Sequence, residues 1–138
     1  MGAALAVHHL AVVVRDVPRA ARFYEEVLGL PRIRVWDDER GELRSVWLGL
    51  AGGAFLAVER APAGASASPA PQPEPGWHCV ALGIARDDRE PWRARLGAAG
   101  VAVERESDFT LYVRDPEGNL VGLSHFPDPR AADPAPPA

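Results

Sequence analysis

The sequence contains no lysine, because all fifteen of its basic residues are arginine. This absence excludes Schiff-base catalysis, a Walker phosphate-binding motif and serine–lysine dyads, since each of them needs a lysine amine. Cysteine is almost absent too, and Cys79 is the single one. One cysteine excludes an internal disulfide and a zinc site built from cysteines alone, and it is typical of a reducing compartment. We therefore expect a cytoplasmic protein.

Long apolar runs and clusters of positive charge are missing as well. No segment approaches the ~20 consecutive apolar residues of a membrane-spanning helix, and the N-terminal MGAALAV lacks the basic start of a secretory signal. The formal net charge is -4, with acids and arginines interspersed. Because nucleic-acid binding needs a basic face, we expect neither a nucleic acid nor a membrane as partner.

Proline, by contrast, is concentrated at two places. Ten of the fourteen prolines lie within residues 61–75 and 127–138. Both stretches are rich in alanine and too poor in large apolar residues to order themselves. We expect residues 61–76 to link an N-terminal module at 1–60 to a C-terminal module at 77–126, and residues 127–138 to form a disordered tail.

The two modules repeat one pattern. The β-branched run at 7–14 predicts a strand, after which Asp16 and Pro18 open an amphipathic helix that Gly29 closes. The run at 77–84 again predicts a strand, and a helix opened by Asp88 and closed by Gly100 follows it. The two strands align at a separation of 70 positions, which indicates an internal duplication.

Three short strands are expected after each helix. They are predicted at about 32–36, 43–50 and 54–59 in the first module, and at about 101–104, 109–114 and 119–125 in the second. Each module thus has the order β-α-β-β-β, which makes the fold class α+β. Two such modules side by side build a curved mixed sheet with helices on its outer face and a pocket on its concave face.

Two sequence strings carry a resemblance to a known family. HHLAVVVRDVPRAARFYEEVLGL in the first module and YVRDPEGNLVGLS in the second resemble the vicinal oxygen chelate superfamily. This superfamily includes glyoxalase I, the bleomycin-resistance proteins, extradiol dioxygenases and methylmalonyl-CoA epimerase. The resemblance covers about residues 5–126 and implies a single domain of paired β-α-β-β-β modules.

The metal-dependent members of that superfamily place one ligand on the first strand and one on the last strand of each module. Carried over to this sequence, the four positions are His9, then Leu56 (or Ala57 if the register slips by one), then Cys79 and Gly122. Only histidine among these is a standard ligand, and cysteine is a second candidate. The resemblance therefore implies that the usual metal site is lost, and we expect no metal and no cofactor.

Aromatic side chains on the predicted strands are the better candidates for contact with a ligand, since Trp and Tyr stack on planar molecules. Core packing is the competing explanation for each of them. Phe55 is a further strand aromatic, Glu59 would reach the pocket only through a β-bulge, and His125 is expected at the surface. The predicted ligand-binding residues are His9, Trp36, Trp47, Leu56, Cys79, Phe109, Tyr112 and Gly122.

The leading hypothesis is a metal-independent protein that binds a small molecule in the concave pocket, sequestering a drug or metabolite as the bleomycin-resistance proteins do. The alternative is a metal-dependent glyoxalase-like lyase, isomerase or dioxygenase with a rearranged site around His9 and Cys79. A module that serves only protein interaction is a third hypothesis. Because small modules leave sheet edges that need cover, and because members of the superfamily commonly dimerise, we also expect a homodimer with two equivalent pockets.

Overall fold

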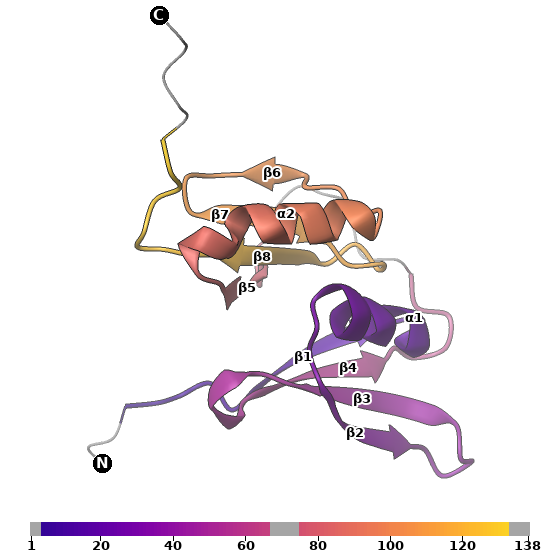
Figure 1. Cartoon of the computed structure of the whole chain (residues 1–138). Coiled ribbons are helices and arrows are strands. Elements are labelled where there is room, and N and C mark those ends of the chain that lie inside the picture. Colours follow the sequence, from indigo (N-terminus) through magenta and orange to yellow (C-terminus); the bar gives the residue numbers. More distant parts are fainter. Residues whose placement is uncertain (1–3, 67–74, 133–138) are drawn as a thin grey trace, which may run out of the picture. The chain divides into compact units, whose positions relative to one another are not determined.

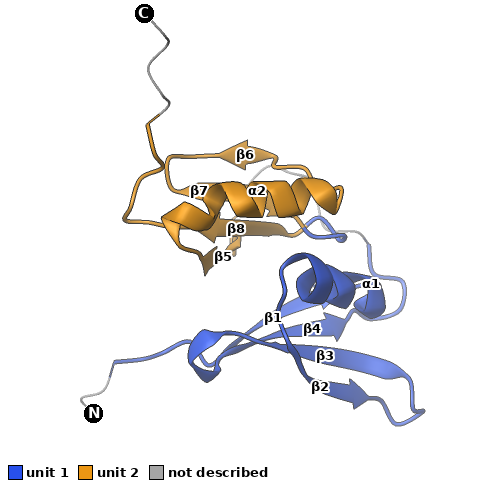
Figure 2. Ribbon diagram, viewed as in Figure 1, with its two compact units in different colours: residues 1–70, 115–118 blue, residues 71–114, 119–138 orange. Residues whose placement is uncertain are grey.

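The structure is a computed structural model that describes residues 4–66 and 75–132. Parts of the expected linker and tail lie outside these residues. The chain divides into two compact units, one formed by residues 1–70 and 115–118 and the other by residues 71–114 and 119–138 (Figure 2). No helix within the described ranges has the length and apolarity needed to cross a membrane.

The first unit contains a four-stranded mixed sheet and a helical segment (Figure 1). Its elements in chain order are β1 (His9–Val14), α1 (Val17–Arg22), the π-helical turn η1 (Phe23–Val27), β2 (Arg32–Asp37), β3 (Leu43–Gly49), the 3-10 turn η2 (Ala51–Gly53) and β4 (Phe55–Arg60). The strand order is β1-β4-β3-β2, with β1 parallel to β4 and the other pairs antiparallel.

The start of α1 follows the expected capping chemistry. Asp16 has an extended backbone, and its carboxylate accepts a hydrogen bond of 3.1 Å from the backbone N–H of Arg19, which satisfies one of the free donors at a helix start. Pro18 stands in the first turn, where its missing N–H costs nothing. The helical segment ends before Gly29, whose φ of 76° suits glycine.

The second unit repeats the topology with shorter strands. Its elements are β5 (Val80–Gly83), the 3-10 turn η3 (Arg86–Asp88), α2 (Arg89–Ala98), β6 (Arg105–Glu106), β7 (Thr110–Arg114) and β8 (Leu120–Ser124), and the strand order is β5-β8-β7-β6. The predicted strand at 101–104 is wrong, because pairing on β7 begins only at Arg105, opposite Tyr112. The α+β class and the two β-α-β-β-β modules are confirmed.

Each module has its own core on the helix side of its sheet. In the first module, α1 lies against β3 and β4, and the buried side chains there are Val14, Ala20, Ala21, Phe23, Tyr24, Val46, Leu48, Leu56 and Val58. In the second module the buried set is Leu96 of α2 with Leu111, Val113, Val121 and Leu123. Burying one such aliphatic side chain stabilises the fold by roughly 1.5–3 kcal/mol.

A buried polar pair completes the core of the first unit. Tyr24 and Asp115 are 1% and 4% exposed, and the tyrosine hydroxyl donates to the carboxylate over 2.7 Å. Burial, reinforced by the negative charge of Asp115, raises the pKa of Tyr24 far above its ordinary value. The tyrosine therefore stays a phenol, and its proton remains available to the buried carboxylate.

Candidate functional site

The register of the first sheet decides which strand residues share a face. Residues directly opposite one another on neighbouring strands point to the same side. Leu10 pairs with Leu56, and Ala11 pairs with Ala57. Leu56 is 4% exposed and belongs to the helix-side core, whereas Ala57 lies on the opposite side, which is called the open face below. Leu56 therefore lies on the helix side of the sheet, and Ala57, the alternative that a register slip would give, lies on the face that also carries Trp47.

The open face carries a continuous row of rings, one from each strand. The ring centroids of His9 (β1) and Phe55 (β4) lie 4.9 Å apart with planes 7° from parallel. Phe55 stacks on Trp47 (β3) at 4.3 Å and 20°, and Trp47 meets Trp36 (β2) edge to face at 5.6 Å. Each such pair contributes about 0.5–1.5 kcal/mol beyond the buried area. We call these four residues the aromatic row.

Both ends of the aromatic row carry nitrogen groups. Arg34 lies over the Trp36 ring, with its guanidinium carbon 4.3 Å from the ring centroid. At the other end the Nδ1 atoms of His8 and His9 are 2.9 Å apart and share a hydrogen bond. His9 is exposed, and Val13 on the same face is 56% exposed. The first unit by itself therefore leaves the histidine end of the row open.

Polar groups lie beside the row. Glu59 pairs with Val13 and with Ser45, so it shares the open face, and no β-bulge is needed to bring it there. The Nε1 atom of Trp36 and the hydroxyl of Ser45 are both buried and lack a hydrogen-bond partner among the described residues. Buried donors without partners are uncommon in proteins, and these two stand on directly opposed strand positions.

The two modules are equivalent at the two last-strand positions that the resemblance implied as metal-ligand positions. Ala57 pairs with Ala11 on the first strand and with Trp47 on the third. Gly122 pairs in the same way with Ala81 and Tyr112. Neither Ala57 nor Gly122 has a donor atom for a metal ion in its side chain. Among the described residues no group of three or more His, Cys, Asp or Glu side chains is placed to hold one.

The surroundings of Gly122 explain why β8 has a glycine at its centre. A Cβ atom built there would lie 3.1 Å from Cγ2 of Thr110, and 3.5 Å from both Cβ of Ala81 and Cε1 of Tyr112. Neighbouring side chains on its own face therefore already fill the space that a side chain would need. The Tyr112 ring is covered in turn by Arg105, whose guanidinium carbon lies 4.3 Å from the ring centroid.

Phe109 and Cys79 are the other predicted ligand-binding residues of the second module. Phe109 precedes β7 at a position that alternates with Thr110, and it packs edge to face on Phe126 at 5.1 Å rather than beside Gly122. Cys79 is a free, half-buried cysteine just before β5.

His125 is not at the surface, contrary to the expectation from its place after the last strand. It is 3% exposed, and Arg89, itself 4% exposed, lies 2.8 Å from its Nε2 atom. Because arginine only donates, Nε2 accepts, and the Nδ1 proton is directed to the carbonyl of Asp128. This histidine is a structural group, and nothing in the strand pattern revealed that an arginine of α2 would cover it.

The fold and the paired modules define a class of proteins built from duplicated β-α-β-β-β units. The sequence model of the Glyoxalase/Bleomycin resistance protein/Dioxygenase superfamily matches residues 6–123. The chain belongs to this superfamily. No curated protein sequence matches it.

Solved structures show the same fold at low sequence identity. A glyoxalase/dioxygenase from Nostoc punctiforme is 20% identical, with a TM-score of 0.74 over 93% of this chain and 99% of the other. A lactoylglutathione lyase from Agrobacterium tumefaciens is 23% identical, with a TM-score of 0.63 over 88% and 93% of the two chains. The fosfomycin resistance protein FosX from Listeria monocytogenes, in complex with Mn(II) and sulfate, is 18% identical, with a TM-score of 0.67 over 91% and 93%.

Proposed function

We propose that this protein binds a planar small molecule and sequesters it without a metal ion, as the bleomycin-resistance proteins of its superfamily do. The observation that supports the proposal is the aromatic row, which crosses all four strands of the first sheet beside Ala57. A row of rings offers a stacking surface to a flat ligand. Ala57, at the position where the resemblance implies a carboxylate ligand in metal-dependent members, has only a methyl side chain.

The proposed binding surface is chemically mixed. Phe55 and Trp47 supply its apolar centre, while Arg34 and His9 supply hydrogen-bond donors at its two ends. Small-molecule sites combine an apolar lining with a few polar groups in this way. We further propose that Cys79, Phe109, Tyr112 and Gly122 of the second module also contact ligand, and that the protein is a cytoplasmic homodimer.

A ligand screen with matched tryptophan variants tests this function. Planar aromatic compounds are screened by thermal shift, because a ligand that binds only the folded protein raises its melting temperature. The dissociation constant of each hit is then measured for the wild type, for Trp47→Leu and for Trp77→Leu. Trp77 is fully exposed outside the row, and it serves as the control. We expect Trp47→Leu to weaken binding about 3- to 10-fold, which corresponds to the loss of one ring stack, and Trp77→Leu to leave it unchanged.

Three results would contradict the proposal. The first is a screen without hits, and the second is equal weakening by both tryptophan variants. The third is near-stoichiometric zinc, nickel, manganese or iron in protein purified without chelator. If His9→Ala then abolished that metal content, the alternative of a rearranged metal site around His9 and Cys79 would be supported instead. Light scattering tests the dimer, because a monomer of about 15 kDa at micromolar concentration would refute it.

A further inference from the structure

An arginine-lined hollow lies at one end of the first unit, away from the aromatic row. It is open to solvent and has a volume of about 810 Å³, within the range of about 300–1,000 Å³ that small-molecule sites occupy. The turn between β2 and β3, the neighbouring ends of three strands and the segment after β4 surround it. Its lining residues are Arg15, Asp38, Arg40, Glu42, Arg44, Arg60 and residues 61–65.

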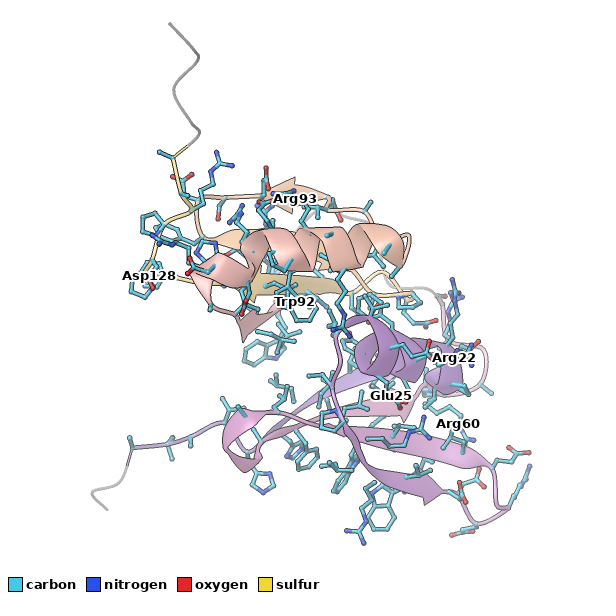
Figure 3. All side chains as sticks on the ribbon, viewed as in Figure 1. Arg22, Glu25, Arg60, Trp92, Arg93 and Asp128 are labelled. Atoms are coloured by element: carbon cyan, nitrogen blue, oxygen red, sulfur yellow. The ribbon has the colours of Figure 1, made fainter. Side chains whose placement is uncertain are left out.

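Arg60 is held in place within this hollow. Its guanidinium donates to the carboxylate of Asp38 over 2.7 Å and to the carbonyl of Leu43 over 3.0 Å, and it lies 3.8 Å from the carboxylate of Glu42. Arg60 is labelled on the ribbon in Figure 3. A guanidinium fixed in this way loses little entropy when it meets a ligand.

The negative charge of Asp38 is already compensated. Its carboxylate accepts from Arg60 and from the backbone N–H groups of Arg40 and Glu42, over 2.9 and 3.0 Å for the two backbone bonds. The bond from Arg60, which is the largest cause, and the bonds from the backbone lower the pKa of Asp38 below its ordinary value. Asp38 therefore acts as an internal brace, and Glu42 is the remaining lining carboxylate.

The other three arginines of the hollow differ in whether a carboxylate lies near them. Arg15 is paired with Glu117 at 3.5 Å. Arg40 and Arg44 are exposed, and neither has a carboxylate within 4.0 Å among residues 4–66 and 75–132. The lining thus combines four arginines with two carboxylates. Arg60 is balanced by Asp38 and Arg15 by Glu117, so Arg40 and Arg44 supply the remaining positive charge, against the single carboxylate of Glu42. This remaining positive charge in a concavity attracts anions.

We propose that this hollow is a second binding site, which takes a small phosphate-bearing molecule. Guanidinium groups bind phosphate oxygens through paired, charge-assisted hydrogen bonds, and the planar fork of arginine suits this geometry better than a lysine amine does. Arg40 and Arg44 bind the phosphate oxygens, while Arg60 and its carboxylate brace keep the hollow open. The site is separate from the proposed aromatic site and does not depend on it.

Calorimetry with pyrophosphate as the probe tests this site on the full chain. Titrations at low ionic strength compare the wild type, Arg44→Gln, Arg40→Gln and the control Arg22→Gln. Arg22 is an exposed arginine of α1 that does not line the hollow, and it is labelled in Figure 3. The control removes the same charge from the same unit. Circular dichroism confirms that each variant is folded.

We expect the wild type to bind pyrophosphate and each hollow variant to bind about tenfold or more weakly, which is the usual loss of a charge-assisted contact. Arg22→Gln is expected to stay within about twofold of the wild type, because only long-range attraction is lost. The proposal is overturned if pyrophosphate does not bind at millimolar concentration. It is also overturned if Arg22→Gln weakens binding as much as Arg44→Gln does, since general charge attraction would then explain the binding.

Discussion

The packing around Gly122 predicts a measurable coupling with Thr110. A Cβ at residue 122 would lie 3.1 Å from Cγ2 of Thr110, a few tenths of an ångström too close. Thr110 cannot turn away freely, because it is 6% exposed and its hydroxyl bonds to Ser124 over 2.9 Å. Overpacking of this kind destabilises the fold by roughly 1–3 kcal/mol, whereas replacing a strand glycine with alanine stabilises it by about 0.5–1 kcal/mol because the unfolded chain loses conformational freedom. Gly122→Ala should therefore lower the free energy of unfolding by about 1 kcal/mol.

A double-mutant cycle isolates this contact. Thr110→Ser removes Cγ2 and keeps the hydroxyl, so it costs about 1 kcal/mol for the lost methyl group. In the Thr110→Ser background, Gly122→Ala should be neutral or stabilising, which gives a coupling of about 1 kcal/mol in urea denaturation. Gly83→Ala is the matched control, because a Cβ at this strand glycine meets nothing within 4 Å.

The packing argument would be refuted if Gly122→Ala lowered the free energy of unfolding equally in the wild-type and Thr110→Ser proteins. It would also be refuted if the Gly122→Ala variant were more stable than the wild type. The larger Gly122→Glu variant carries the same steric cost and adds an ionised group to a buried position. Under the proposed function, this variant should also weaken binding of an apolar aromatic ligand by roughly tenfold or more, about 1.4 kcal/mol.

Two further predictions concern polar pairs of the first unit. Tyr24→Phe leaves the buried carboxylate of Asp115 without the phenol donor, so the free energy of unfolding should fall by about 1.5–3 kcal/mol. The control Tyr112→Phe removes a hydroxyl from a half-buried ring and should change the free energy of unfolding by less than about 0.5 kcal/mol. Equal losses for the two variants in urea denaturation would contradict this reasoning. Because Arg60 lowers the pKa of Asp38 below its ordinary 3.8, the stability that Asp38 contributes is present above that pH and is lost as the pH falls through the lowered value. Wild type should therefore be more stable than Asp38→Asn at pH 6, with the difference narrowing on acidification, and a pH-independent difference would show that the ion pair contributes nothing.

The sequence by itself determined the order of elements and the duplication, because these depend on local chemistry. The N-cap at Asp16, the glycine that closes α1 and the alternating apolar runs act within a few residues, so their effect is visible without the fold. The strand pattern predicted the aromatic candidates, whereas His9 became a candidate through the resemblance to the superfamily. The strand pattern could not decide whether each aromatic side chain contacts a ligand or packs in the core. Alternation shows that two residues share a face of a strand, but it does not show which face packs against the helix.

Only the tertiary structure decided the register and the partners across strands. A shift of one residue exchanges the two faces of a strand, and the pairing of Ala11 with Ala57 settled that Leu56 belongs to the core. The burial of His125 depends on Arg89 of α2, 36 residues earlier in the chain. The crowding of Gly122 depends on Thr110 and Tyr112 of the neighbouring strand. Such contacts join residues that are distant in sequence, so no local pattern encodes them, and they appear only once the strands are paired.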